Sequence, residues 1–574
     1  MRIYVSLSFL LIIAALWYGT TGCANVGSPT GGSKDTIPPQ LLTSLPLSGS
    51  VNYKQGIIRM EFSEAVVLKN LQSQLIISPR TSVPYKTRVN RNVVELRFDK
   101  PFADSTTYTF NFRDGIVDIT EGNPVPNLYL AFSTGSYLDS LRLQGNVQRA
   151  LTNAAADGAT VAIYDARDTL NIFSDKPLYF TKTDKEGNYE IRNLKRGRYL
   201  VYAFNDKNNN LTLQSKDEAY GFWPDTLQLQ ASQDSINIST FRANADVPAI
   251  TNARPTTAGY YEVTFNKSMQ NYRLQLNTGD SIASNFIEEQ KKIRIYPFAL
   301  QDSLGATLLA WDSLQQQLEQ QIMIRFEPGR RKREALVTTS VLPKANTALS
   351  RTVTFELTFN KPIASLRLDS IRLVYDSITF QGFAPADVRW NERRDKLRLQ
   401  KTLQPPRRAV QPPSATADAQ TLARQGSEGA GQNARLLIPK GSIQSVESDT
   451  LDNQEVSYKI AQESQTGIIS GTIQSAETNF ILQLVRANNF EVVAEQYNAR
   501  SYTFRFVEAG EYRLRIIRDL NNNGRWDAGN IRKLQAPEPV YVYPDPISIK
   551  AQGDPASGNS AVKAVYKWRS AVDK

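Results

Sequence analysis

Three copies of one short pattern decide the fold: MEFSEAV at residues 60–66, VTFNKSM at residues 263–269 and LTFNKPI at residues 357–363. Each copy has an apolar residue two positions before a phenylalanine, then a polar residue, a charged residue and a further apolar position. Side chains alternate between the two faces of a β-strand, so we expect each phenylalanine to face a core and the polar pair to end the strand. Self-similar segments along one chain indicate repeated modules.

The composition indicates several folded domains and excludes many catalytic sites. A chain of 574 residues, 41% of them hydrophobic and 10% aromatic, is too long for one core and too aromatic to be disordered throughout. The absence of histidine excludes Ser-His-Asp and HExxH sites, and the single cysteine excludes an intrachain disulfide or a four-cysteine zinc site. No GxSxG, P-loop or GxGxxG motif occurs, so we expect no enzymatic activity.

The rest of the chain continues in short strands. Residues 93–98 and 108–112 alternate apolar and polar positions, and turn residues such as Asp114-Gly115 punctuate them at intervals typical of β-sandwiches. The best helical candidate, residues 312–321, is short and rich in glutamine, and its alternative interpretation is a polar hairpin connection. The sequence therefore predicts an all-β fold.

A second kind of repeat links two distant regions. The segment YEIRNLKRGRY at residues 189–199 aligns without gaps to YTFRFVEAGEY at residues 502–512. The same separation of 313 residues relates Gly197 to Gly510 and Asp206 to Asp519. We interpret the two regions as copies of one module.

These repeats resemble two known families. Residues 37–136 resemble the bacterial Ig-like domain of the SbsA type, on IPP at 37–39, MEFSE at 60–64, LRF at 96–98 and YTF at 108–110. Residues 141–245 resemble the carboxypeptidase-regulatory, transthyretin-like β-sandwich, on GNV at 145–147, TDKEGNY at 183–189 and GRY at 197–199. The copy at 467–550 is similar but lacks the Asp-x-x-Gly turn before Tyr502. The order of modules resembles Ig-like surface lipoproteins of Gram-negative bacteria, a class defined by architecture.

The expected organisation is an elongated series of tandem Ig-like and transthyretin-like β-sandwich domains. Its parts are a signal peptide (1–22), a flexible tether (23–40), an Ig-like domain (41–136), a carboxypeptidase-regulatory-like sandwich (141–245), a β-sandwich module (247–345), an Ig-like β-module (346–460) with a disordered insert (404–433), and a transthyretin-like sandwich (467–574).

The N-terminus predicts a lipid anchor. An apolar run at residues 3–18 is too short to span a membrane and leads to the only thiol, Cys23. The segment resembles a lipobox, although Thr20 departs from the usual aliphatic residue, and the resemblance implies acylation of Cys23, for instance by palmitate. The alternative is an ordinary secretory peptide with an incidental cysteine. An acylated Cys23 would hold the protein at the outer membrane, facing the periplasm or the cell surface.

One loop has the spacing of a calcium site. Residues 519–530 place oxygen ligands at positions 1, 3, 5, 7, 9 and 12 of an EF-hand-type loop, with Gly524 at the sharp turn. Only two of them are carboxylates, so calcium affinity would be weak, about 10⁻⁴–10⁻³ M. The candidate ligands are Asp519, Asn521, Asn523, Arg525 through its carbonyl, Asp527 and Asn530.

The equivalent loop at 206–217 is a weaker candidate, because Leu211 replaces the glycine. An alternative interpretation holds for both loops: asparagine forms tight turns because it tolerates positive φ and bonds its own backbone. The candidate ligands in this loop are Asp206, Asn208, Asn210, Thr212 and Asp217.

Two further segments have a structural and a binding interpretation each. The basic cluster at residues 329–334 could contact anionic lipopolysaccharide, but a charged hairpin tip that protects a sheet edge is favoured. The aromatic segment 220–224 could bind sugar or peptide, but packing at a domain junction is favoured. The net charge of +11 is spread widely, and aromatic residues do not interleave the basic cluster, so we expect no nucleic-acid partner.

The sequence thus favours a lipid-anchored structural or binding protein of the cell envelope, with envelope proteins or glycans as partners. One alternative is a lipoprotein that binds polysaccharide or assists its degradation. The other is an envelope assembly factor that faces the periplasm.

Overall fold

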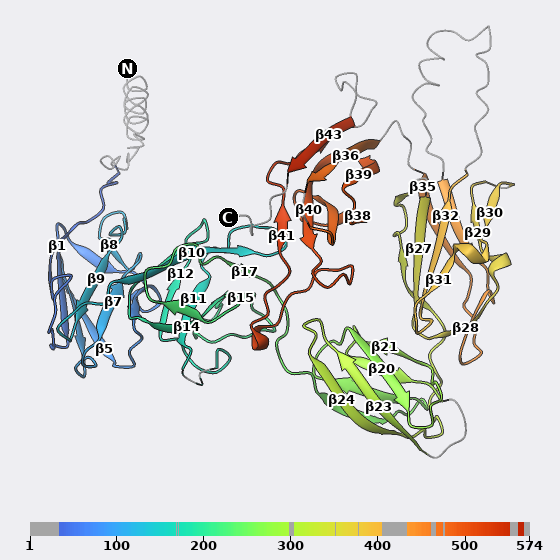
Figure 1. Cartoon of the computed structure of the whole chain (residues 1–574), viewed down its shortest axis with the longest axis horizontal. Helices are drawn as coiled ribbons and strands as arrows, with labels where there is room; N and C mark the ends of the chain where they lie inside the picture. The colour runs from blue at the N-terminus through green and yellow to red at the C-terminus, as the bar shows by residue number, and fades with distance from the viewer. Residues whose placement is uncertain are drawn as a thin grey trace, which may run out of the picture. The chain divides into compact units, whose positions relative to one another are not determined.

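The three phenylalanine patterns lie on equivalent strands of the computed structural model: β2 (Ile57–Phe62), β19 (Tyr261–Phe265) and β27 (Thr352–Phe359), of which Figure 1 labels β27. Each strand lies second in a four-stranded antiparallel sheet. In all three sheets, the pairing between this strand and the first strand contains a register shift. The phenylalanines are buried, as the alternation of side chains predicts.

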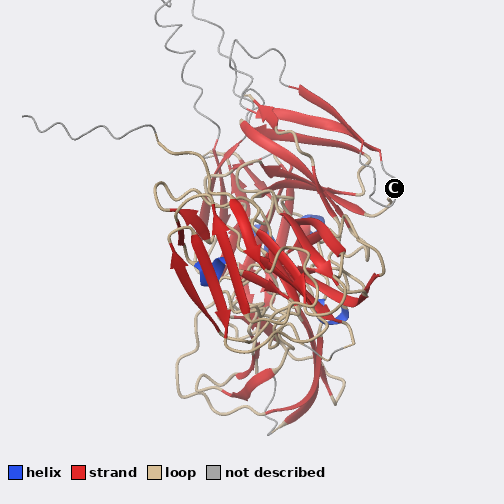
Figure 2. Cartoon of the chain, turned by 90° about the vertical axis from the view of Figure 1, so that its left-hand side faces the viewer, coloured by secondary structure: helices blue, strands red, loops and turns tan. Residues whose placement is uncertain are grey.

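The structure describes residues 34–167, 169, 171–297, 303–349, 352–376, 378–404, 433–460, 466–474, 477–550 and 561–567. The predicted signal peptide, Cys23, most of the predicted tether and nearly all of the predicted insert lie outside these residues. Within them, strands make up nearly all regular structure (Figure 2), which confirms the all-β prediction. The described part of the chain holds no helix long and apolar enough to cross a membrane.

The chain divides into two compact units, Met1–Ser140 and Leu141–Lys574. The first unit holds one sandwich, the first module, whose core is rich in phenylalanine. Ring contacts link Phe98 to Phe102 and Phe110, and both of these to Phe132. Its strands are β1 (Leu41–Leu45), β2, β6 (Val93–Phe98) and β5 (Tyr85–Asn90) in one sheet; β4 (Ile76–Ser78), β7 (Thr107–Asn111) and β9 (Tyr129–Ser133) in another; and β3 (Val66–Leu68) paired with β8 (Ile116–Asp118). The short helix α2 (Leu71–Gln74) follows β3.

The second unit begins with the second module, a sandwich whose first strand, β10, pairs in parallel with its last strand, β17. Gly145 is required here, because a Cβ would come within 2.1 Å of the carbonyl oxygen of Ile236. Its strands are β13 (Asn188–Leu194), β10 (Leu141–Arg149) and β17 (Ile238–Thr240) in one sheet; and β12 (Tyr179–Lys182), β11 (Thr160–Asp165), β14 (Gly197–Phe204) and β15 (Tyr220–Phe222) in the other, where β16 (Leu227–Leu229) also pairs with β14.

The fifth module repeats this topology strand by strand, including the parallel pair. The 313-residue separation superposes the start of β13 on that of β39 and the start of β14 on that of β40. Its strands are β39 (Ser501–Glu508), β36 (Thr466–Gln474) and β43 (Ala561–Lys567) in one sheet; and β38 (Val492–Tyr497), β37 (Phe480–Arg486), β40 (Gly510–Arg518) and β41 (Val540–Val542) in the other, with β42 (Ile547–Ile549) on β40. The 3₁₀ helix η4 (Ile531–Lys533) follows the asparagine-rich loop.

The third module contains the region proposed as a helix. Residues 312–316 connect β23 to β24, and β24 begins at Gln317, so the hairpin alternative is confirmed and the helix is wrong. The strands of this module are β18 (Ile250–Pro255), β19, β22 (Lys292–Ile295) and β21 (Ser284–Ile287) in one sheet, and β20 (Asn271–Leu276), β23 (Leu304–Trp311) and β24 (Gln317–Ile324) in the other.

The fourth module has the same first sheet and a five-stranded second sheet. Its strands are β25 (Thr338–Leu342), β27, β32 (Lys396–Thr402) and β31 (Val388–Trp390); β26 (Ala348–Leu349), β35 (Gln454–Ile460), β33 (Asn433–Ile438), β29 (Arg372–Val374) and β30 (Phe380–Gly382); and β28 (Ile363–Leu366) paired with β34 (Ile443–Ser445). Two 3₁₀ turns, η1 (Leu368–Ser370) and η2 (Pro385–Asp387), complete it.

Candidate functional site

The asparagine-rich loop of the fifth module is built around a buried carboxylate. Asp519, at the end of β40, exposes 3% of its surface. Its Oδ1 accepts the backbone N–H of Asn523 at 2.9 Å, and its Oδ2 accepts that of Gly524 at 2.8 Å. The side-chain oxygens of Asn521 and Asn523 accept the N–H two residues further on. These bonds are the ones that the tight-turn interpretation expects.

Four of the predicted ligands meet in this loop. The side-chain amides of Asn521 and Asn523 donate to Oδ2 of Asp527 at 2.6 and 2.7 Å, beside the carboxylate of Asp519. In this arrangement their N–H groups point at Asp527. The Oδ1 atoms of these two amides accept the N–H groups of Asn523 and Arg525, so turning the amides over would break both backbone hydrogen bonds. The arrangement therefore fits tight turns as it stands, and a calcium ion at this point would require those two bonds to break.

Of the two remaining predicted ligands, Arg525 and Asn530, the side chain of Asn530 points away from these four residues. Both polar atoms of the Asn530 amide bond other residues: Oδ1 accepts the N–H groups of Arg532 and Lys533, and Nδ2 donates to the carbonyl of Leu314 at 3.2 Å. Asn530 thus caps η4 and ties it to the third module. The Arg525 side chain lies 3.6 Å from Asp527.

Glu538 is the acidic neighbour that the loop spacing did not reveal. It is buried, and its carboxylate accepts the N–H groups of Leu520 at 2.7 Å and Asp527 at 3.0 Å. Burial raises the pKa of Glu538, and the negative charges of Asp527 and Asp519 raise it further, against the lowering effect of its two backbone hydrogen bonds. A bound cation would relieve this repulsion.

The loop of the second module has the same backbone despite its missing glycine. Asp206 accepts the N–H groups of Asn210 and Leu211, and Asn210 accepts that of Thr212. Leu211 adopts φ 63°, close to the φ 75° of Gly524, and Asn209 and Asn522 share φ 55°. The two loops therefore have matching backbone conformations, although Leu211 replaces the glycine.

The acidic residue that enters this loop is Glu218, one position after the predicted ligand. Asp217 is exposed, whereas Glu218 exposes 2% and accepts the N–H groups of Lys207 and Gln214. Each loop therefore joins one buried aspartate to one buried glutamate. Among the described residues, no group of three or more cysteine, aspartate and glutamate side chains is arranged to hold a metal ion.

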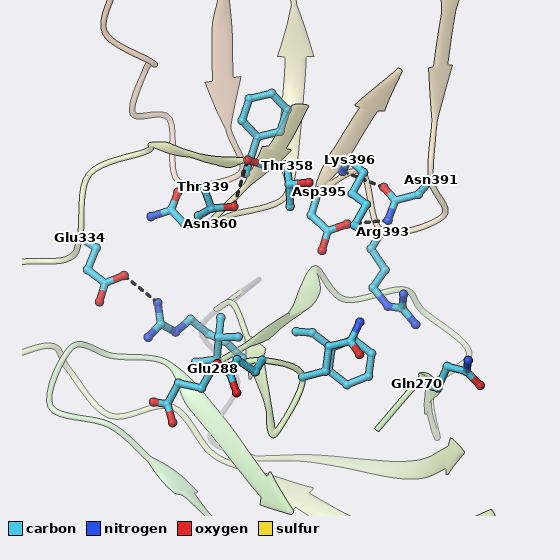
Figure 3. A pocket seen from close by; sticks show the side chains of 16 residues that line it. Gln270, Glu288, Glu334, Thr339, Thr358, Asn360, Asn391, Arg393, Asp395 and Lys396 are labelled. Carbon is cyan, nitrogen blue, oxygen red and sulfur yellow. Dashed lines mark hydrogen bonds and ion pairs between the residues drawn. The ribbon is translucent and has the colours of Figure 1, made fainter. Parts of the chain in front are cut away.

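A cleft of about 710 Å³ opens between the third and fourth modules (Figure 3). Figure 3 shows Glu288 and Gln270 on one wall and Thr339, Thr358, Asn391, Asp395 and Lys396 on the other. Arg393 crosses from the fourth module to the third, where it bonds Asn271 and lies 4.3 Å from the ring centre of Tyr272. The cleft is lined by hydroxyls, amides and charges of both signs.

The other two candidate segments lie in a linker and in a core. The basic cluster at 329–334 lies between β24 and β25, so the hairpin-tip interpretation is wrong: it belongs to the linker into the fourth module. The backbone N–H groups of Arg330 and Arg331 bond the carbonyl of Thr257. In the segment 220–224, Tyr220 and Phe222 are buried in the core, as the packing interpretation predicted.

Comparison with known proteins identifies the first module. Residues 35–134 match the family model of the bacterial Ig-like domain. The first module is a bacterial Ig-like domain. This agrees with the resemblance seen in the sequence. A comparison with curated proteins gives no match.

Solved structures give distant likenesses. The S-layer protein SbsC is 10% identical, with 83% of this chain and 64% of that chain covered and a TM-score of 0.14. Dimeric latent PorU from Porphyromonas gingivalis is 9% identical, with 50% and 34% covered and a TM-score of 0.22. BcpA, the major pilin subunit of Bacillus cereus, is 12% identical, with 75% and 99% covered and a TM-score of 0.12. The matches span less than two thirds of SbsC and of PorU.

Proposed function

We propose that this protein is a lipid-anchored component of the cell envelope with a structural or binding role and no catalytic activity. The observation that carries the proposal is the use made of its buried charges. Lys267 pairs with Asp312 and Lys361 pairs with Glu447, and none of these four residues lines the cleft. The buried carboxylate that does line the cleft, Asp395, accepts a hydrogen bond from the side-chain amide of Asn391. Function would then reside in exposed loops and strand edges on a rigid scaffold.

Crosslinking of intact envelopes tests this proposal. Partners that co-purify with the crosslinked wild-type chain would support a scaffold or adhesion role. Protease treatment of intact cells distinguishes the two orientations: cleavage of the chain supports surface display, and cleavage only after permeabilisation supports the alternative of a periplasm-facing assembly factor. A hydrolytic activity of the purified protein that is lost on substitution of one carboxylate would contradict the proposal.

The cleft between the third and fourth modules favours a second candidate function, polysaccharide binding. Hydroxyl, amide and carboxylate groups hydrogen-bond sugar hydroxyls, and a volume of about 710 Å³ lies in the range of small-ligand sites. A glycan array with the delipidated protein tests it. Thr339→Val should reduce binding. Thr251→Val is the matched control, because Thr251 donates to the carbonyl of Thr264 as Thr339 donates to that of Thr358, but lies outside the cleft.

We further propose that the loop at 519–527 binds calcium weakly. Support comes from the convergence of Asp519, Asn521, Asn523 and Asp527 and from the raised pKa of the neighbouring Glu538. The loop at 206–212 has the same backbone and is the second candidate.

A further inference from the structure

The polar pair that ends the repeated strand has a second role in the third module. Asn266 binds the incoming linker with both atoms of its amide: Oδ1 accepts the N–H of Ala249 at 2.9 Å, and Nδ2 donates to the carbonyl of Val247 at 2.8 Å. The next residue, Lys267, directs its ammonium at the same linker. Nζ donates to the carbonyls of Asn244 and Asp246. Asn266 therefore binds the linker at residues 247 and 249, and Lys267 binds it at residues 244 and 246.

The ammonium of Lys267 is fixed by a buried counter-ion. Nζ lies 2.6 Å from Oδ2 of Asp312, and the two side chains expose 3% and 0%. Asp312 is itself fixed, since its Oδ1 accepts the N–H groups of Leu314 and Gln316. An ammonium has three N–H donors, and two linker carbonyls and one carboxylate use all of them. Removing one partner would leave the other as an unpaired buried charge, so this geometry is strongly maintained.

The fourth module repeats the arrangement on its own linker. Oδ1 of Asn360 accepts the N–H of Val337, and Nδ2 donates to the carbonyl of Ala335, both at 2.9 Å (Figure 3 shows Asn360 beside the cleft). Lys361, 1% exposed, lies 2.6 Å from Glu447 and 2.9 Å from Asp449. Asp449 in turn accepts the N–H of Leu336 at 2.7 Å. Here the lysine reaches the linker through a carboxylate.

The first module lacks the lysine. Ser63 exchanges hydrogen bonds with the backbone of Gln40, but Glu64 occupies the position of the two lysines. The complete pair thus occurs in the third and fourth modules, each of which follows another sandwich within the second unit. The first module follows the predicted tether and not another sandwich.

We propose that the Asn-Lys pairs 266–267 and 360–361 are joint locks. Each binds the linker to the body of the module that it enters, and so fixes the direction in which that module leaves the preceding one. Residues 245 and 532 reinforce the first lock, because Nε of Arg532 in the fifth module donates to the carbonyl of Ala245 at 2.9 Å. Three consecutive linker carbonyls, 244–246, are therefore bound by cationic side chains.

Distance measurements between spin labels test the second lock. Cysteines at Gln320 in the third module and Gln400 in the fourth, both exposed, carry nitroxides in a full chain with Cys23→Ser. The parent should give one narrow distance peak. Asn360→Ala and Lys361→Met should each lose it in favour of a broad distribution. Lys459→Met, which removes an exposed lysine from the same module, should keep it.

Folding is checked separately. Near-ultraviolet circular dichroism shows whether each variant retains its packed cores. If Lys361→Met unfolds the fourth module, Asn360→Ala decides, because it removes two hydrogen bonds and leaves the buried charges paired. A broad distribution in the parent, or a narrow peak in a folded Asn360→Ala protein, would overturn the proposal.

Discussion

Asp118, at the end of β8, concentrates more hydrogen bonds on one carboxylate than any neighbouring acid described in the first module. Oδ1 accepts the N–H groups of Glu121 and Gly122, both at 2.8 Å, and Oδ2 accepts the side chain of Asn123 at 2.7 Å. Burial acts to raise the pKa of Asp118, but these bonds, with one from Thr120, outweigh it and hold the pKa at about 2. The charged form thus stabilises the β8–β9 turn.

We expect the first module to lose stability in acid through this residue. The folded pKa of about 2 lies below the unfolded value of about 3.9, so the contribution is present above pH about 4 and is lost as pH falls toward 2. Asp118→Asn should lower the urea midpoint of residues 34–140 at pH 7 and should flatten its decline between pH 4 and pH 2. Asp114→Asn, an exposed acid in the preceding turn, is the control and should change neither. Equal pH dependence in wild type and Asp118→Asn would contradict the assignment.

At the scale of the element, the two asparagine-rich loops show how far a spacing rule extends. The rule placed Asp519, Asn521, Asn523 and Asp527 together correctly, because side chains two residues apart in a tight loop face one centre. It could not locate Glu538 or Glu218, since a residue that enters a loop from a later segment leaves no trace in the spacing. The spacing rule also predicted Asn530 as a calcium ligand. That side chain contacts the third module instead, and such a contact depends on tertiary packing.

Exchanging the sixth residue of the two loops tests their shared backbone. A residue other than glycine in the left-handed region costs about 1–2 kcal/mol. Gly524→Ala should therefore destabilise the fifth module by about 1 kcal/mol, since the new Cβ meets only Tyr497 at an ordinary 3.6 Å. Leu211→Gly removes the same strain and should lose less than Gly524→Ala despite its truncated side chain. Calorimetric unfolding measures both, and a neutral Gly524→Ala would contradict the assigned φ.

Calcium binding is tested by titration calorimetry on the Cys23→Ser protein. We expect a weak site with a dissociation constant of about 10⁻⁴–10⁻³ M and a rise in Tm with millimolar calcium. Asp527→Asn should abolish the heat from the loop at 519–527, because it removes the carboxylate that both asparagine amides face. Asp545→Asn, an exposed acid of the same module, is the control. No heat and no shift in Tm would leave the loops as turns alone.

The strands were predictable because their signals are local. Alternation and the two repeats indicated sandwiches, and the shared strand orders of β1-β2-β6-β5, β18-β19-β22-β21 and β25-β27-β32-β31 agree with the repeated pattern. The linker bonds of Lys267 and Lys361 were not predictable, because a polar pair at the end of a strand has the same appearance whether or not it binds another segment. The hairpin-tip prediction for the basic cluster was wrong for the same reason. Its charges are visible in the sequence, but its position in a linker between two modules depends on the fold.

At the scale of the whole molecule, the anchor remains the decisive prediction. Cys23→Ser should move the protein from the membrane fraction to the soluble fraction, because no acyl chain could then be attached. Thr21→Ser, which leaves the thiol in place, is the control. Fractionation with immunoblotting measures the outcome, and mass spectrometry of the mature N-terminus identifies the modification. Retention of Cys23→Ser in the membrane would contradict the anchor.

The parallel pair of β36 and β43 sets the order in which the fifth module is completed. Ile468–Gln474 pairs with Ala561–Lys567, so the opening strand of this sandwich receives one neighbour only from its closing strand. A ribosome delivers the opening strand first, and until the closing strand follows, an edge of β36 stays available to any other extended chain. The sheet that contains β36 can therefore be completed only after β43 has been synthesised.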